Sequence, residues 1–243
     1  MKVTLWFFGF CFFPLILSAQ ENLLRTAISN FPPLSYVDDN QKITGVIPET
    51  YRIISQELGI PIKIEHYPIL RIRSMMQAGI LNMYLCAKAS EQKYSDFYFY
   101  EKPLIVLTTI LFQARSEPPL TSIEDLQGKD VLMELGIQWL KNLIPASNSI
   151  QASRFSTLHT KLFESRANYL LDIKERMGKV LAQENAFRQY PISQLKSYIC
   201  LHKNYPDAQS VAKQIYDFFL FYQDTEEGKN LFEQQGFNGR FGE

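Results

Sequence analysis

Residues 27–49 read AISNFPPLSYVDDNQKITGVIPE, and the elements of the fold can be worked out from this stretch outward. An apolar run leads into a loop that holds Phe31 and two prolines, and the Asp-Asp-Asn run at 38–40 is typical of a turn. Pro48 then lies where the first turn of a helix accepts proline. Because proline also restricts the unfolded chain, such a loop loses little conformational entropy when it is held in place. The stretch therefore predicts a strand, a stiff loop and a helix.

In the segments that follow, the spacing of apolar residues alternates between that of a helix and that of a strand. The helix that begins at Pro48 has one apolar face and ends at Gly59. The other elements of this unit are strands at residues 23–29, 60–67 and 80–87 and a helix at 70–78. Alternating strands and helices predict an α/β unit with a largely parallel sheet.

A second unit begins after Pro103 and repeats this pattern. Thr121 and Glu124 have the spacing of a capping box, at the start of a short helix that Gly128 stops. The remaining elements expected are strands at residues 105–112, 131–135 and 167–173 and helices at 137–144 and 158–164. From about residue 195 a strand and a helix with a wide apolar face follow. We expect this tail to return to the first unit, so that two chain crossings act as a hinge.

Composition excludes some partners and allows others. Lys plus Arg equals Asp plus Glu at 25 each, with no basic cluster, so neither nucleic acid nor an acidic surface is indicated. The aromatic content of 14% fits a well-filled core and also a pocket that holds a small organic molecule.

Residues 1–20, MKVTLWFFGFCFFPLILSAQ, have the layout of a secretory signal peptide with cleavage near Ala19. A transmembrane anchor is the alternative, but the apolar run is short for a bilayer and Pro14 interrupts it. Export would place Cys86 and Cys200 in an oxidising compartment, where they form one bridge or remain two buried thiols.

Six motifs occur in a characteristic order. They are NFPPLSYVDDNQKITGVIPE (30–49), YPILRIRSMMQAGILN (67–82), SEQKYSDFYFYEKPL (90–104), SIEDLQGKDVLMELG (122–136), SRANYLLD (165–172) and SYICLHKNYPDAQ (197–209). Together they resemble the family-3 extracellular solute-binding proteins, which include the periplasmic receptors of polar amino-acid ABC importers. The resemblance covers essentially the whole chain after residue 20.

The resemblance implies a type II periplasmic-binding-protein fold, in which two α/β lobes joined by a two-strand hinge close on a small ligand. Residues 21–104 would form lobe 1, residues 105–194 lobe 2, and residues 195–243 a return to lobe 1. We expect a periplasmic monomer that binds a small molecule, without cofactor, metal or nucleic acid, and that serves an ABC transporter permease.

In lobe 1 the family places an aromatic side chain of the first loop on the ligand. This implies Phe31, with Tyr36 nearby; the alternative is that Phe31 only packs within its own lobe. The chain departs from the family where an Arg usually binds the ligand carboxylate in a two-point contact. Here that segment begins Cys86, Ala87, Lys88 and contains no Arg. Lys88 or Lys93, or Arg71 from the neighbouring helix, would have to supply the positive charge.

In lobe 2 the family presents backbone N–H groups at a helix start to an anionic ligand group. Gly136, Ile137 and Gln138 match that position, and Trp139 follows them. Asp172, at the end of the strand in SRANYLLD, matches the acidic residue that pairs with a ligand ammonium. A surface salt bridge is the alternative role for Asp172.

The resemblance also bears on the cysteines. In this fold the strand that returns to lobe 1 lies beside the third strand of that lobe, which places Cys200 near Cys86. A cross-strand disulfide between them is the hypothesis that follows.

No motif for catalysis is present in the sequence: it lacks GxSxG, HExxH, CxxC and a glycine-rich phosphate loop. We therefore expect no enzymatic activity and a protein that captures a small polar or amphiphilic, amino-acid-like molecule. One alternative is an enzyme like the cyclohexadienyl dehydratases of this fold, for which Glu91, Glu134 and Asp172 are the candidate acids. The other is a ligand-sensing partner of a membrane receptor.

Overall fold

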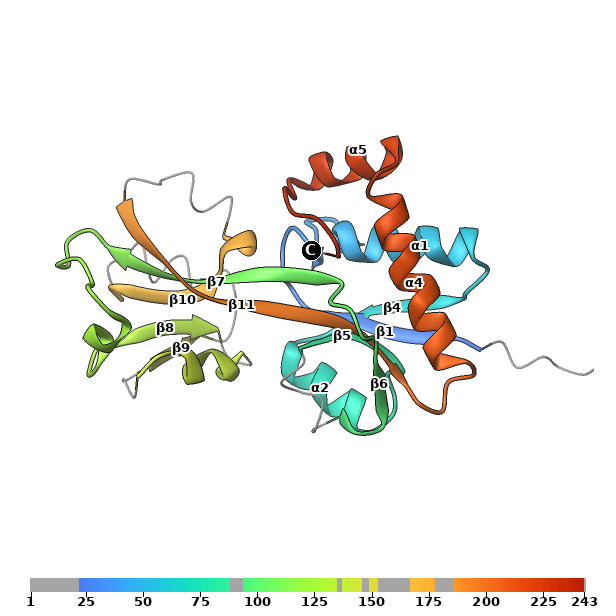
Figure 1. Ribbon diagram of the computed structural model, residues 1–243, viewed down its shortest axis with the longest axis horizontal. Coiled ribbons are helices and arrows are strands. Elements are labelled where there is room, and N and C mark those ends of the chain that lie inside the picture. Colours follow the sequence, from blue (N-terminus) through green and yellow to red (C-terminus); the bar gives the residue numbers. More distant parts are fainter. Residues whose placement is uncertain are drawn as a thin grey trace, which may run out of the picture.

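The computed structural model describes residues 22–87, 94–134, 137–145, 149–152, 167–177 and 186–242. It consists of two lobes that two long strands connect (Figure 1). The mixed α/β architecture predicted from the sequence is therefore confirmed. The predicted signal peptide and the helix expected at residues 158–164 lie outside the described residues.

Lobe 1 contains the N-terminal strands and the C-terminal helices. Its elements are β1 (Leu24–Ile28), β2 (Tyr36–Val37), β3 (Ile43–Thr44), α1 (Val46–Glu57), β4 (Ile62–His66), α2 (Ile69–Gln77), β5 (Met83–Ala87), β6 (Phe97–Phe99), α4 (Ala208–Tyr222) and α5 (Glu226–Gln235). β1 and β4 run in parallel, with Leu24 opposite Ile62 and Ile28 opposite His66. The Asx-rich turn connects β2 to β3, which pair with each other.

Lobe 2 is built around the parallel strands β8 and β9 and the strand β10. Its elements are η2 (Ile123–Leu126), β8 (Val131–Glu134), η3 (Gln138–Leu143), β9 (Ser149–Ala152), β10 (Tyr169–Ile173) and the single-turn η4 (Lys174–Arg176). β8 lies between β9 and β10 and is parallel to both. One buried apolar cluster covers each side of these strands, the first around Phe112 and Leu170 and the second around Leu111 and Leu171.

The two connecting strands are β7 (Ile105–Ala114) and β11 (Phe187–His202). They pair antiparallel from Ile105 opposite Ser197 to Ala114 opposite Phe187, with an irregularity between Pro191 and Ser193. The strand order β5-β11-β7-β10-β8-β9 makes one sheet that extends through both lobes. The predicted boundary at residues 194 and 195 falls inside β11. The sheet is not largely parallel as predicted, because the returning strand β11 is antiparallel to β5, β6 and β7.

Aromatic packing holds the C-terminal helices on lobe 1. The rings of Tyr51 on α1 and Phe219 on α4 meet edge to face, with centroids 5.6 Å apart. Phe219 also contacts Phe241 near the chain end, and Phe232 of α5 contacts Phe241 in turn. Full burial of one such side chain stabilises a fold by about 1.5–3 kcal/mol. These contacts fix α1, and with it the loop that precedes α1.

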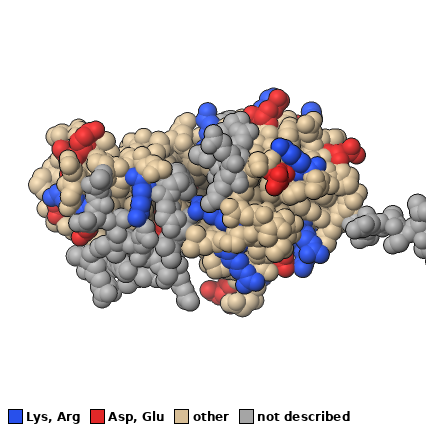
Figure 2. Space-filling model, turned by 90° about the horizontal axis from the view of Figure 1, so that it is seen from below, with Lys and Arg blue, Asp and Glu red and all other residues tan. Residues whose placement is uncertain are grey.

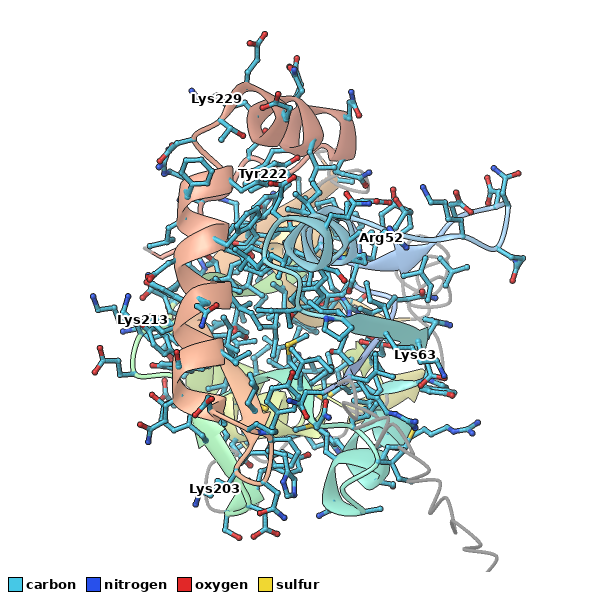
Figure 3. All side chains as sticks on the ribbon, turned by 90° about the vertical axis from the view of Figure 1, so that its right-hand side faces the viewer. Arg52, Lys63, Lys203, Lys213, Tyr222 and Lys229 are labelled. Atoms are coloured by element: carbon cyan, nitrogen blue, oxygen red, sulfur yellow. The ribbon has the colours of Figure 1, made fainter. Side chains whose placement is uncertain are left out.

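The charged side chains on the surface of lobe 1 are mixed in sign. On the face shown in Figure 2, Lys and Arg side chains of lobe 1 are interspersed with Asp and Glu. Lys203, Lys213 and Lys229 point outward from the margin of lobe 1 in Figure 3.

No helix among the described residues combines the length and the apolar composition that a membrane span requires.

The capping box in lobe 2 differs from the prediction by one residue. Ser122 is the N-cap of η2, and its partner is Asp125, whose carboxylate accepts from the N–H groups of Ser122 and Thr121 at 3.1 and 2.7 Å. Thr121 and Glu124 were predicted instead. Both pairs have the required spacing, so the sequence offers two registers and only the backbone geometry distinguishes them.

The predicted disulfide is wrong in this structure, where Cys86 and Cys200 are both thiols. As the hypothesis required, β11 lies beside β5. However, the register places Cys86 opposite Tyr198 and Cys200 opposite Tyr84. The two cysteines are therefore diagonal neighbours, and diagonal positions lie about 7–8 Å apart. That is beyond the usual Cα separation of a disulfide.

Candidate ligand-binding site

A cavity of about 850 Å³ lies between the two lobes. Lobe 1 contributes the end of β1 and its loop, α1, α2 and β5, while lobe 2 contributes the ends of β8 and β10 and the residues after them. The middle of β11, residues 193–198, forms part of the wall between them. The cavity thus adjoins both lobes and the hinge, and its volume is in the range of small-molecule sites.

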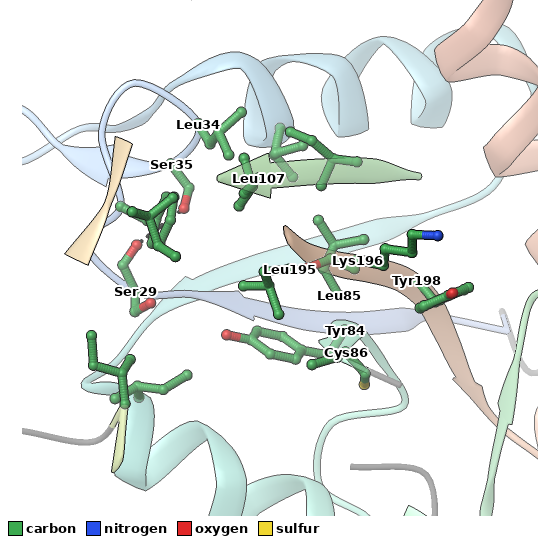
Figure 4. A pocket seen from close by; sticks show the side chains of 18 of the residues that line it. Ser29, Leu34, Ser35, Tyr84, Leu85, Cys86, Leu107, Leu195, Lys196 and Tyr198 are labelled. Carbon is green, nitrogen blue, oxygen red and sulfur yellow. Dashed lines mark hydrogen bonds between the residues drawn. The ribbon is translucent and has the colours of Figure 1, made fainter. Parts of the chain in front are cut away.

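Most of the cavity wall is apolar. Figure 4 shows Leu195 next to the ring of Tyr84, with Leu34 and Leu107 on the opposite side of the same space. Ile28 and Ile47 extend this surface in lobe 1, and further aliphatic side chains, Ile137, Leu143 and Ile173, extend it in lobe 2. A ligand with an apolar body would remove this surface from water, at about 25 cal/mol per Å² buried.

Phe31 reaches from lobe 1 toward lobe 2. Its backbone is fixed by a two-way exchange with Ser35, since Phe31 N–H donates to the Ser35 carbonyl at 2.6 Å and Ser35 N–H donates to the Phe31 carbonyl at 3.0 Å. The Phe31 ring lies under the guanidinium of Arg176, with 5.1 Å between the guanidinium carbon and the ring centroid. An aromatic face and a cation attract at this distance.

Arg176 is the centre of a buried ionic cluster. Its Nη1 is 2.6 Å from Glu134 Oε2 at the end of β8, and its Nε is 2.8 Å from Asp172 Oδ1 at the end of β10. Its Nη2 donates to Asp172 Oδ2 at 3.1 Å, and the Ile173 N–H donates to Asp172 Oδ1 at 2.7 Å. Burial raises the pKa of Asp172, while the Arg176 charge and the Ile173 N–H act in the opposite direction.

A second polar group lies on the lobe 1 side of the cavity. Arg73 of α2, Tyr84 of β5 and Tyr94 all line the cavity. Burial raises the pKa of both tyrosines, and the positive charge of Arg73 opposes that rise at each of them. The three side chains therefore line one cavity, and the charge of Arg73 acts on both tyrosines. Ser29 lines the same part of the cavity. These groups together can donate to an anionic or carbonyl oxygen.

Four of the predicted site residues line this cavity: Phe31, Cys86, Ala87 and Ile137. Their positions follow from the strand and loop order, which places the loop after β1 and the end of β5 on one edge of the sheet. Cys86 is only 3% exposed and also packs with the cluster beneath α2.

Three predicted site residues lie elsewhere. Tyr36 turns toward α5, where its hydroxyl donates to Gln235 Oε1 at 2.9 Å. Arg71 is exposed and stacks on Tyr67, with 4.4 Å from its guanidinium carbon to the ring centroid. Asp172 is 0% exposed and lies behind Arg176, so it does not line the cavity. Its predicted pairing with a ligand ammonium is replaced by pairing with Arg176.

Three predicted site residues, Lys88, Lys93 and Gly136, lie outside the described residues. The structure describes Gln138 and Trp139 only as the backbone of η3, at the start of that short helix.

Sequence reasoning missed Arg73, Tyr84 and Arg176. Arg73 is two positions from Arg71 on α2, and a two-residue step turns a side chain to another face of a helix. Glu134 was considered only as an acid for an enzyme. The spacing of Asp172 and Arg176, four residues apart, is the signal that could have revealed their ion pair.

No protein-family model and no curated protein matches this chain. Its fold, however, is similar to that of many solved structures. One is Tv2483 bound to L-arginine, with a TM-score of 0.73 and 13% identity over 90% of this chain and 93% of that one. Another is an ABC uptake transporter substrate-binding protein from Streptococcus pneumoniae with bound histidine, with a TM-score of 0.71 and 13% identity over 90% and 94%.

A third similar structure is a histidine kinase sensor domain with similarity to periplasmic binding proteins, with a TM-score of 0.66 and 14% identity over 88% of this chain and 94% of that one. These likenesses establish the two-lobed type II periplasmic-binding-protein fold that the sequence predicted.

Proposed function

We propose that this chain is a solute-binding protein that captures a small amphiphilic organic molecule between its lobes and closes around it. The observation that carries the proposal is the cavity itself, whose wall is drawn from lobe 1, lobe 2 and the connecting strand β11. A ligand that contacts all three parts binds best when the lobes are together, and it therefore shifts the population toward the closed form.

The bound form would then be recognised by an ABC importer. This part of the proposal is supported by the likeness to the substrate-binding protein of an ABC uptake transporter. The proposal includes export by the signal peptide at residues 1–20, a periplasmic location and a monomeric state. Pull-down of a permease with the ligand-loaded protein, but not with the ligand-free protein, is the result expected.

A thermal-shift screen tests the proposed binding. The panel contains amino acids, organic acids, amines and small sugars, each with the purified protein. A solute present at about 100 times its Kd stabilises the folded form by about 2.7 kcal/mol. For a chain of this length we expect the melting temperature to rise by about 5–10 °C. A panel in which no compound raises the melting temperature contradicts the proposal.

We also propose that the protein performs no chemical step. The support is that two of the three candidate acids, Glu134 and Asp172, are both bound by Arg176, so neither is placed to transfer a proton. Incubation with prephenate should leave the compound unchanged. Formation of phenylpyruvate, detected by its absorbance, would contradict this and favour the dehydratase alternative.

A sensor is the second candidate function. The likeness to a histidine kinase sensor domain supports it, because the same fold occurs there in a sensor domain. In that case the ligand-loaded chain would bind a membrane receptor instead of a permease, and the same pull-down distinguishes the two.

A further inference from the structure

The charged groups on the cavity wall show which kind of ligand the cavity accepts. Among the described residues these are Arg73 on lobe 1, Glu134 and Arg176 on lobe 2, and Lys196 on β11. Lys196 is exposed, and in Figure 4 its ammonium points away from Ser29 and Tyr84. The choice of ligand therefore depends on Arg73 and on the pair formed by Glu134 and Arg176.

The acidic groups of lobe 2 already have a cation. Arg176 contacts Glu134 at 2.6 Å and Asp172 at 2.8 Å, and its side chain is only 1% exposed. A ligand ammonium that approached Glu134 would also approach this guanidinium, and like charges repel. To reach Asp172 it would have to displace Arg176, which would leave a buried charge without its partner.

The aromatic face of Phe31 is also engaged by the same cation. The Arg176 guanidinium carbon lies 5.1 Å from the Phe31 ring centroid. An aromatic face that lies next to two carboxylates attracts a cation, and it could therefore bind the ammonium group of a ligand. Here Arg176 fills that place from within the protein, so among the described residues this face of Phe31 is already occupied by a cation.

The lobe 1 side differs because its cation makes no ion pair with a described carboxylate. Arg73 lines the same cavity as Tyr84 and Tyr94. A guanidinium is suited to a carboxylate, which can accept two parallel hydrogen bonds from Arg, and a tyrosine hydroxyl on the same wall can donate a further one. The aliphatic wall formed by Leu34, Leu107 and Leu195 would cover the rest of such a ligand.

We propose that the ligand is an amphiphilic carboxylic acid, with its carboxylate on Arg73 and an apolar body along the aliphatic wall, and that it needs no ammonium group. Arg176 is then a specificity-determining residue that fills the acidic position of lobe 2. This inference rests on the proposed solute-binding function and names the ligand class for the same cavity.

The test compares three probes that share one apolar body: 3-phenylpropanoate, phenylalanine and phenethylamine. Calorimetric titration of the purified protein should show that 3-phenylpropanoate binds about tenfold or more tightly than either of the others. Equal or tighter binding of phenylalanine or phenethylamine overturns the inference. If none of the three binds but a sugar from the screen does, the inference fails and the solute-binding function stands. If no compound binds at all, the proposed function itself fails.

Arg73→Gln tests the carboxylate site, and Arg71→Gln is its matched control on the same helix. Arg73→Gln should weaken 3-phenylpropanoate binding about tenfold or more, whereas Arg71→Gln should leave it unchanged because Arg71 stacks on Tyr67 outside the cavity. Equal affinities in the two variants would overturn the assignment of Arg73.

Two variants test the role of Arg176. Arg176→Met should leave Glu134 and Asp172 without their cation and raise the affinity for phenethylamine relative to 3-phenylpropanoate. Because that variant removes a buried charge and can fail to fold, Glu134→Gln provides a second test. It should tighten 3-phenylpropanoate binding by about twofold to fivefold, since one negative charge leaves the cavity. Weaker binding of the acid in Glu134→Gln contradicts the inference.

Discussion

At the residue scale, Arg176 determines what Asp172 and Glu134 can do. Sequence reasoning assigned Asp172 to a ligand ammonium. In the structure that carboxylate accepts from Arg176 and from the Ile173 N–H and is fully buried. Its role is therefore to hold Arg176 in position, and its loss should affect the folded state first.

We predict that Asp172→Ala lowers the free energy of unfolding by about 3–5 kcal/mol, because it leaves a buried guanidinium with one carboxylate instead of two. Urea denaturation measures the change. Lys213→Ala is the control, since its ion pair with Asp217 is exposed and such pairs contribute at most about 1 kcal/mol. A similar small loss in both variants would show that the Asp172 pair is not structural.

At the scale of elements, the start of α1 positions the loop that carries Phe31. The N–H groups of Val46 and Ile47 donate to the carbonyls of Pro33 and Leu34 at 3.2 and 2.9 Å. The N-cap Gly45 has φ of 112° and packs so closely that a Cβ there would lie 2.7 Å from the Leu34 carbonyl oxygen. The contact requires glycine on two grounds, its backbone conformation and the lack of space.

Gly45→Ala should therefore lower stability by about 1–3 kcal/mol and also weaken ligand binding, because the loop has to move. Gly59→Ala is the matched control: its φ is 65°, but no atom lies within 4 Å of a Cβ there. The control should lose stability without any change in ligand affinity. Calorimetric titration with a solute found by the thermal-shift screen separates the two, and unchanged affinity in Gly45→Ala would contradict the role given to this contact.

The cap of η2 gives a prediction for pH. Hydrogen bonds from the Thr121 and Ser122 N–H groups and from the Thr121 hydroxyl lower the pKa of Asp125 below its ordinary value of 3.8. A carboxyl whose pKa is lower in the folded state stabilises the fold above its unfolded pKa, and this contribution is lost as the pH falls through the folded value. Below pH 3.8 the difference in stability between wild type and Asp125→Asn should therefore shrink. Urea titrations at several pH values measure it, and a difference that does not change with pH contradicts the prediction.

The elements also show what the sequence could predict. Strands β1, β4, β5, β8 and β10 and helices α1, α2 and α4 overlap their predicted ranges, since apolar periodicity and turn residues mark them locally. The full length of β11 could not be predicted, because residues 187–194 are held by pairing with the distant strand β7. The same limit applies to the site. The order of loops and strands is enough to place Phe31 and Cys86 at the cavity. The place of Arg73 and Arg176 in the cavity wall depends on the direction of their side chains, which is decided by packing.

At the scale of the whole molecule, Phe31 and Arg176 form a contact between the two lobes. We predict that Phe31→Ala separates the lobes slightly in the absence of ligand, because this contact is lost while β7 and β11 still connect them. Small-angle X-ray scattering should give a larger radius of gyration for the ligand-free variant, and added ligand should reduce the difference. Phe221→Ala, whose side chain on α4 is 67% exposed, is the control. Scattering curves that coincide for wild type and both variants would contradict a bridging role.

The position of β11 has a consequence for how the chain reaches its native state. In the sheet, β11 lies between β5 and β7, although both of these precede it by about a hundred residues or less in the chain. A nascent polypeptide that ends before residue 187 has synthesised both neighbours but lacks the strand that separates them. Its sheet edges stay open until residues 187–202 have been synthesised, and exposed edges invite aggregation. Assembly of the sheet must therefore wait for β11, and a chaperone that binds open strand edges would be most needed just before β11 emerges.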